Sequence, residues 1–166
     1  MATHDWSRFS LRIPVNAAIE NLYRYWATRE GLESWFLRKA AFTMPAENPR
    51  PANELVKRND VYEWRWHGWP DDVVEHGTIL ESNGKDYLKF SFGKAGNVAV
   101  TIREDQGENI VELVQDEIPT DERSITLYHL GCTKGWLFYL SNLKSIAEGG
   151  LDLRNRNEAL KDVVNS

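Results

Sequence analysis

The sequence is poor in cysteine, which excludes several kinds of structure and site. Its 166 residues contain a single cysteine, Cys132, so the chain cannot form an internal disulfide, a thiolate metal cluster or a CxxC redox pair. The four histidines are scattered, at positions 4, 67, 76 and 129, and none has the spacing of a metal-binding motif such as HExxH. We therefore expect neither a metal nor another cofactor.

Long apolar runs and an excess of positive charge are also missing. No stretch approaches the roughly 18 consecutive apolar residues that a membrane-spanning helix needs, and the first residues lack the pattern of a signal peptide. Lysine and arginine number 20 against 25 aspartates and glutamates, which gives a net charge of -5. Because nucleic-acid-binding proteins rely on basic surfaces, nucleic acid is not an expected partner. We expect a cytoplasmic protein without a membrane span.

Glycine and proline are uncommon, whereas aromatic residues are abundant. The chain has 11 glycines and 6 prolines, with 42% apolar and 27% charged residues, which excludes collagen-like, low-complexity and fully disordered proteins. Its length fits one domain with a single core. Seven tryptophans, six tyrosines and six phenylalanines are present. Most of these rings are expected in the core, because exposing them all would create a large adhesive patch.

Alternation of apolar and polar residues predicts seven strands. These cover residues 7–15, 36–44, 60–68, 73–81, 86–92, 98–104 and 110–118. Asn83 and Gly84 predict a tight hairpin turn between the fourth and fifth strands. The proline-containing residues 45–59 are expected to form a loop and to be the most mobile segment. Strands that follow one another through hairpins form an antiparallel meander.

The tight turn also predicts which residues face each other across the hairpin. With a two-residue turn, Ile79 lies opposite Leu88 and Gly77 lies opposite Phe90. The same parity, carried through the later strands, turns Gln115 toward the same inner face of the sheet. A one-residue bulge would change this assignment.

Helical spacing of apolar residues predicts two short helices and one long one. The first follows Asn16, as its N-cap, up to Gly31, and a second short helix covers residues 32–35. The long helix covers residues 121–149 with Thr120 as its N-cap. Its apolar stripe consists of Ile125, Tyr128, Cys132, Gly135, Trp136, Tyr139, Leu143 and Ile146.

Two glycines lie one turn apart inside the long helix. A glycine in a helix costs about 1 kcal/mol relative to alanine, so Gly131 and Gly135 indicate close approach to another backbone or to a ligand. The whole pattern predicts an α+β protein, in which a seven-stranded antiparallel sheet curls around the long C-terminal helix and two short helices follow the first strand. Residues 1–154 would form this domain, and residues 155–166 a polar tail.

Four segments carry a resemblance to a known family. They are residues 26–36 (WATREGLESWF), 77–81 (GTILE), 135–144 (GWLFYLSNLK) and 148–154 (EGGLDLR). These segments are similar to the START-like superfamily, also called SRPBCC or birch-pollen-allergen-like. Within it they resemble the homologues of the activator of heat-shock-protein ATPase, the AHSA group.

The resemblance implies a helix-grip fold with a cavity between the sheet and the long helix. Relatives use such a cavity to bind lipids, sterols or polyketides, and some are enzymes. We therefore expect non-catalytic binding of a hydrophobic small molecule, lipid-like or aromatic. Two alternatives remain: a co-chaperone-like module that binds a protein partner, or an enzyme of unknown reaction that uses the same cavity.

The candidate ligand-binding residues are those that the parity and the helical stripe turn toward this cavity. They are Tyr62, Trp64, Trp66, Gly77, Ile79, Phe90, Val100, Leu113 and Gln115 from the sheet and Tyr128, Cys132, Gly135, Trp136 and Tyr139 from the helix. Tyr139 and Gln115 would supply polar anchors in an otherwise apolar site.

No residue is assigned a catalytic role. Cys132 falls on the apolar stripe, where a free cysteine usually acts as a small hydrophobe. His129 falls on the flank of the stripe and is expected to be solvated or half-buried. Glu75 and Gln115 point inward near strand ends, where exposure at the rim is expected, and Arg154 is expected on the surface beyond the helix.

Overall fold

A computed structural model of the chain describes residues 3–164. Within this range the elements follow one another as β1 (Phe9–Pro14), α1 (Ile19–Ala27), α2 (Arg29–Trp35), β2 (Lys39–Thr43), β3 (Val61–Arg65), β4 (Glu75–Ser82), β5 (Tyr87–Ser91), η1 (Gly93–Ala95), β6 (Asn97–Asp105), β7 (Glu108–Asp116), α3 (Glu122–Ser124), η2 (Ile125–Leu130) and α4 (Gly131–Ala147). Residues 1, 2, 165 and 166, which belong to the two expected ends of the chain, lie outside the described residues.

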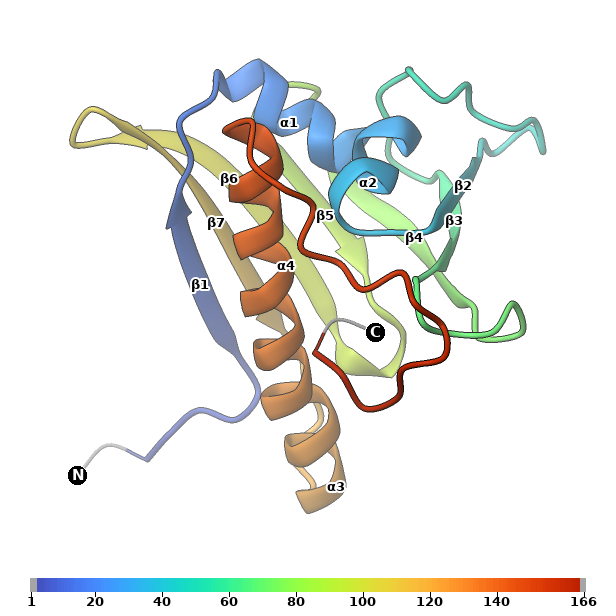
Figure 1. The fold of residues 1–166 in the computed structure, drawn as a ribbon, viewed down its shortest axis with the longest axis vertical. Helices are drawn as coiled ribbons and strands as arrows, with labels where there is room; N and C mark the ends of the chain where they lie inside the picture. Colours follow the sequence, from blue (N-terminus) through green and yellow to red (C-terminus); the bar gives the residue numbers. More distant parts are fainter. Residues whose placement is uncertain (1–2, 165–166) are drawn as a thin grey trace.

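The seven strands of the described chain form one antiparallel sheet in the order β1-β7-β6-β5-β4-β3-β2. In Figure 1 the long helical segment lies across the sheet beside β1, and α1 and α2 lie across one end of it. The predicted α+β helix-grip architecture, with two short helices after the first strand, is confirmed.

The register of the β4–β5 hairpin differs from the prediction. Ile79 pairs with Phe90 rather than with Leu88, and a bulge lies between Ile79 and Glu81. The turn is wider than two residues because the side-chain oxygen of Asn83 accepts hydrogen bonds from three successive backbone N–H groups, at positions 85 to 87. The pairing at Ile79 is shifted by two residues, and a shift of two preserves the face, so Ile79 and Phe90 still point into the core.

The helix predicted from Asn16 to Gly31 is two helices. Its first part begins only at Ile19, after Ala18, which provides no side-chain cap. The break comes at Thr28, whose hydroxyl oxygen accepts a hydrogen bond from the N–H of Gly31 at 3.0 Å and so caps α2. The capping role predicted for Asn16 was therefore wrong, and the functional cap lies inside the predicted helix.

The long helix predicted over residues 121–149 is continuous but not uniform. Asp121, rather than Thr120, caps it by accepting a hydrogen bond from the N–H of Ser124 at 3.0 Å. Its second segment, η2, is a π-helix, which holds more residues per turn than an α-helix. The wider turn rotates His129 inward to 5% exposure, so the expectation of a solvated or half-buried histidine was wrong.

Aromatic side chains dominate the core between the sheet and the helices. The largest fully buried side chains include Trp26, Trp35 and Trp64. Two tryptophans lie outside this core, because Trp6 is 37% and Trp69 50% exposed. The core therefore uses most of the abundant rings, and how tightly they pack decides whether any cavity remains.

Candidate functional site

Rings fill most of the space where the cavity was predicted. Tyr62 and Trp64 stack with their ring centroids 3.8 Å apart, and Phe90 meets Trp64 edge-on at 5.2 Å. The hydroxyl of Tyr62 donates a hydrogen bond to the carbonyl oxygen of Ser91 at 2.6 Å. Burial raises the pKa of Tyr62 well above its ordinary value. These three candidate residues form a closed aromatic stack whose one hydroxyl is already paired.

The volume that Gly77 leaves free is occupied by the protein itself. The Tyr62 ring packs directly over Gly77, so that any side chain at position 77 would collide with it. Three further candidate residues lie in the same closed core, where each is at most 1% exposed: Ile79, Val100 and Leu113. The side chains of these six sheet candidates therefore pack against one another in the core and do not line an open cavity.

Gln115 is fully buried rather than exposed at the rim. Its amide nitrogen donates to the carbonyl oxygen of Ala95 and its amide oxygen accepts from the indole nitrogen of Trp136, both at 2.9 Å. A buried amide needs such partners, and these two hold it inside. The bond to Trp136 links β7 to α4 and fixes the indole ring at the inner end of the site described next.

One apolar pocket remains open beside α4, where the two helix glycines lie. It has a volume of about 180 Å³. It is lined by Phe36, Trp66, Phe92, Gly131, Cys132, Gly135, Trp136 and Tyr139. A Cβ atom at Gly135 would meet no surrounding atom within 4 Å, so this glycine borders open space. Five of the lining residues were predicted for the site, whereas Phe36, Phe92 and Gly131 were not among those candidates.

Most of the ring contacts in the pocket involve Phe36, which meets its neighbours there edge-to-face or tilted. Phe36 lies at 79° to Trp66 and at 81° to Tyr139, with ring centroids 5.7 Å and 4.9 Å away. Trp136 tilts 30° against Phe36 at 4.9 Å. Phe36 and Trp136 are buried, whereas Trp66, Phe92 and Tyr139 are half-buried. The buried pair therefore forms the inner end of the pocket and the others form its mouth.

Tyr128, the remaining helix candidate, is half-buried outside this lining.

The polar groups near the pocket are poorly suited to nucleophilic chemistry. Burial raises the pKa of the Cys132 thiol, so the thiol is protonated near neutral pH. Burial also raises the pKa of Tyr139 to about 12. Glu75 is half-buried, and burial raises the pKa of its carboxyl group. The side chains of Tyr139 and Glu75 form no hydrogen bond or ion pair with another residue of the described chain, whereas the thiol of Cys132 has Gln115 as a hydrogen-bond partner.

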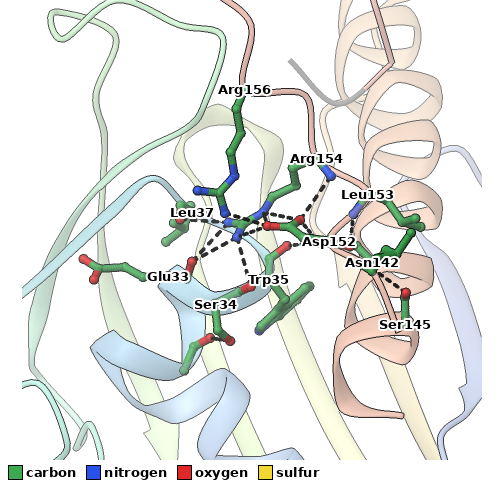
Figure 2. A network of polar contacts seen from close by, with 12 residues as sticks. Glu33, Ser34, Trp35, Leu37, Asn142, Ser145, Asp152, Leu153, Arg154 and Arg156 are labelled. Carbon is green, nitrogen blue, oxygen red and sulfur yellow. Dashed lines mark hydrogen bonds and ion pairs between the residues drawn. The ribbon is translucent and has the colours of Figure 1, made fainter. Parts of the chain in front are cut away.

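Arg154 organises the backbone that carries Phe36 into the pocket. Its guanidinium group donates to the carbonyl oxygens of Glu33, Ser34 and Leu37, at 2.9 to 3.2 Å, and Figure 2 shows it between the end of α2 and Asp152. The residue is only 6% exposed, so its expected surface position was wrong. Arginine binds here because the last carbonyls of a helix lack partners and attract cations.

Asn142 fastens the same junction from the side of α4. Its amide nitrogen donates to the carbonyl oxygen of Trp35 at 2.7 Å, and its amide oxygen accepts from the N–H of Leu153 at 2.8 Å (Figure 2). The chain that follows α4 is therefore fixed to both α4 and α2. This junction sets the relative positions of Phe36, which follows α2, and Trp136, which lies on α4.

We expect the Asp152→Asn variant to be less stable than the natural sequence at neutral pH and equally stable in acid. Burial alone would raise the pKa of Asp152, but hydrogen bonds from Arg154 and Arg156 outweigh it and hold the pKa well below 3.8. Because the folded pKa is lower than the unfolded one, the stabilisation is complete above the unfolded value and is lost as pH falls below it. Urea unfolding at pH 7 should show a deficit of about 2 kcal/mol, which narrows below about pH 3.8. A deficit independent of pH would contradict this.

The described residues contain neither a group of three or more His, Cys, Asp or Glu side chains placed to hold a metal ion nor a helix long and apolar enough to cross a membrane. The model of the family described as "Activator of Hsp90 ATPase homolog 1-like protein" matches residues 16–148. The chain belongs to this AHSA1-like family. The family is part of the SRPBCC superfamily, so the predicted family membership is confirmed, although the match ends at the first residue of the fourth segment.

Solved structures of other proteins share the fold of this AHSA1-like domain. Protein SSP2350 from Staphylococcus saprophyticus is 16% identical with a TM-score of 0.68, over 89% of this chain and 96% of that one. The Aha1 dimer from Colwellia psychrerythraea is 13% identical with a TM-score of 0.65, over 86% and 97%. The AHSA1-like protein from Aeromonas hydrophila is 15% identical with a TM-score of 0.59, over 86% and 92%. No curated protein matches the sequence.

Proposed function

We propose that this AHSA1-like domain binds a small hydrophobic molecule in the pocket beside α4 without changing it chemically. The observation that carries the proposal is the open space at Gly135, where five of the eight lining residues are aromatic. Ligand sites are concave and mostly apolar with few polar groups, and this pocket has that character. The protonated thiol of Cys132 and the high pKa of Tyr139 favour binding over catalysis.

The volume limits what the pocket can hold. At about 180 Å³ it is smaller than the 300 to 1,000 Å³, roughly, of sites for drug-sized ligands. It suits a single ring or a compact branched alkyl group, and the rest of a larger ligand would lie outside its mouth. A sterol could enter only if the stack of Tyr62, Trp64 and Phe90 came apart.

Binding should be visible in the intrinsic fluorescence, because Trp66 and Trp136 line the pocket. We expect saturable quenching by single-ring aromatic compounds and short branched acids. The Gly135→Leu variant should bind them at least tenfold more weakly, since a Cβ atom there enters open space and the rest of the side chain would occupy the pocket.

The matched control is Lys134→Leu, which adds the same side chain at an exposed neighbouring position. It should bind like the natural sequence, and circular dichroism should show both variants folded. Equal binding by the two variants, or no saturable change with any compound, would contradict the proposal.

A second candidate function is docking to a protein partner. It is favoured by three leucines on the outer side of the long helical segment, Leu127, Leu130 and Leu137, which are 49%, 51% and 58% exposed. Exposed apolar side chains that gather on one face mark many interaction sites. The family name refers to activation of the Hsp90 ATPase. This co-chaperone-like hypothesis takes precedence if the pocket binds none of the compounds.

A further inference from the structure

The pocket is lined by rings to a degree that simple hydrophobicity does not require. Aliphatic side chains would enclose an apolar group equally well, yet five of the eight lining residues are aromatic. The face of an aromatic ring carries partial negative charge and attracts cations. Each ring that faces the pocket therefore favours a positively charged group over a neutral group of the same shape.

The ring geometry suits a compact cation. Trp66 and Tyr139 both stand nearly perpendicular to Phe36, and all three rings line the pocket, so here the word box means this ring-lined space. Phe36 and Phe92 both contact Trp136, so a group in the pocket lies close to several rings at once. An alkylated ammonium group is no bulkier than the equivalent branched alkyl group, so the volume of about 180 Å³ admits it.

An acid without a partner lies next to the box. Glu75 is on β4, and its carboxylate packs on Gly93, which follows the lining residue Phe92. Its charge also acts on the thiol of Cys132, another lining residue. Glu75 is half-buried and forms no hydrogen bond or ion pair within the described chain. A half-buried carboxylate is destabilised unless a positive charge or donor compensates it, and a cation in the pocket would do so.

The arginine that acts on the pocket residue Tyr139 is already paired. Arg154 acts electrostatically on Tyr139, but it forms an ion pair with Asp152 at 2.9 Å, and Arg156 binds the same carboxylate at 2.6 Å. Only His76, its neighbour on β4, is a positive group that acts on Glu75, and Glu75 forms no ion pair with it in the described chain.

We propose that the ligand of this pocket carries an alkylated ammonium group, held by the aromatic rings, with Glu75 as its counter-ion. This inference rests on the proposed function, because it requires that the pocket binds a small molecule. It names the chemical class of that molecule: a quaternary or methylated amine whose remaining part extends out of the mouth.

The test compares choline with 3,3-dimethyl-1-butanol, in which a carbon atom replaces the charged nitrogen in the same shape. Both are titrated at constant ionic strength, with tryptophan fluorescence and calorimetry as readouts. Choline should bind at least tenfold more tightly, because only its charge interacts with the ring faces and with Glu75. The Glu75→Gln variant should weaken choline binding at least threefold and leave binding of the alcohol unchanged.

The matched control is Glu63→Gln, which removes the same charge from an exposed position on β3. It should change neither affinity. If both compounds bind equally, the cation inference is overturned while the proposed apolar site stands. If neither binds, both fail. An equal loss of choline affinity in the two glutamine variants would overturn the assignment of Glu75.

Discussion

Replacing Arg154 by alanine should lower the free energy of unfolding by about 3–5 kcal/mol. The side chain is 1% exposed and binds three backbone carbonyls around the end of α2 as well as Asp152. Alanine would leave these carbonyls buried without donors and would take one of two arginines from the carboxylate. For a chain of this size the loss corresponds to a melting temperature lower by roughly 10 °C, measurable by calorimetry.

Two further variants separate the contribution of the guanidinium hydrogen bonds from that of the positive charge. Arg154→Lys keeps the charge but lacks the planar set of donors, so it should recover only a minor part of the loss. Arg156→Ala is the matched control, because Arg156 binds the same Asp152 from a side chain that is 60% exposed. Exposed ion pairs contribute roughly 0–1 kcal/mol, so this variant should remain near the natural stability. A loss of less than 1 kcal/mol in Arg154→Ala would show that the junction does not depend on it.

Much of the fold could be predicted because its determinants are local in sequence. Alternation at period two marks every strand, and the helical stripe marks the long C-terminal helix. The wrong predictions of the hairpin register and of the first helix occur where a side chain, rather than another backbone group, accepts a backbone hydrogen bond. Asn83 accepts three backbone hydrogen bonds and widens the turn, and Thr28 caps a second helix inside the first. Such bonds leave the apolar pattern unchanged, so the pattern could not reveal them.

The candidate site was harder to predict because a cavity depends on how rings pack. Gly77 and Gly135 looked alike in the sequence, as missing side chains facing one space. In the structure Tyr62 covers Gly77, whereas Gly135 opens into the pocket. Ring orientation decides between these outcomes, and the sequence does not determine it. Phe36 and Phe92 could have been included, since one lies in a segment shared with the family and the other on the inner face.

Arg154 shows the limit most clearly. It was recognised as part of a family segment but placed on the surface, because it follows the end of the long helix. Its carbonyl partners at Glu33 and Leu37 precede it by 121 and 117 residues. No local pattern reports a contact over such separations, so a buried cation at this junction becomes visible only in three dimensions.

Replacing Asp60 by alanine should also destabilise the fold, by about 3–5 kcal/mol. Asp60 is 0% exposed and receives two hydrogen bonds from Arg50, which is 8% exposed, and one from the N–H of Lys57. Hydrogen bonding to Asp60 raises the pKa of Arg50, so the arginine stays charged. Without the aspartate this charge would stay buried, and its remaining ion-pair partner would be the exposed carboxylate of Glu54 at 3.4 Å.

The size of this loss reflects an unpaired charge rather than a strong bond, and a double variant distinguishes the two. A buried ion pair gains little over apolar residues, but losing one partner leaves the other uncompensated. Arg50→Met combined with Asp60→Ala should therefore be more stable than Asp60→Ala alone. Glu54→Ala is the matched control, because this carboxylate binds the same arginine at 3.4 Å but its side chain is 56% exposed. This variant should lower the free energy of unfolding by less than roughly 1 kcal/mol. If urea unfolding shows the double variant to be no more stable than Asp60→Ala alone, the unpaired charge of Arg50 does not account for the loss.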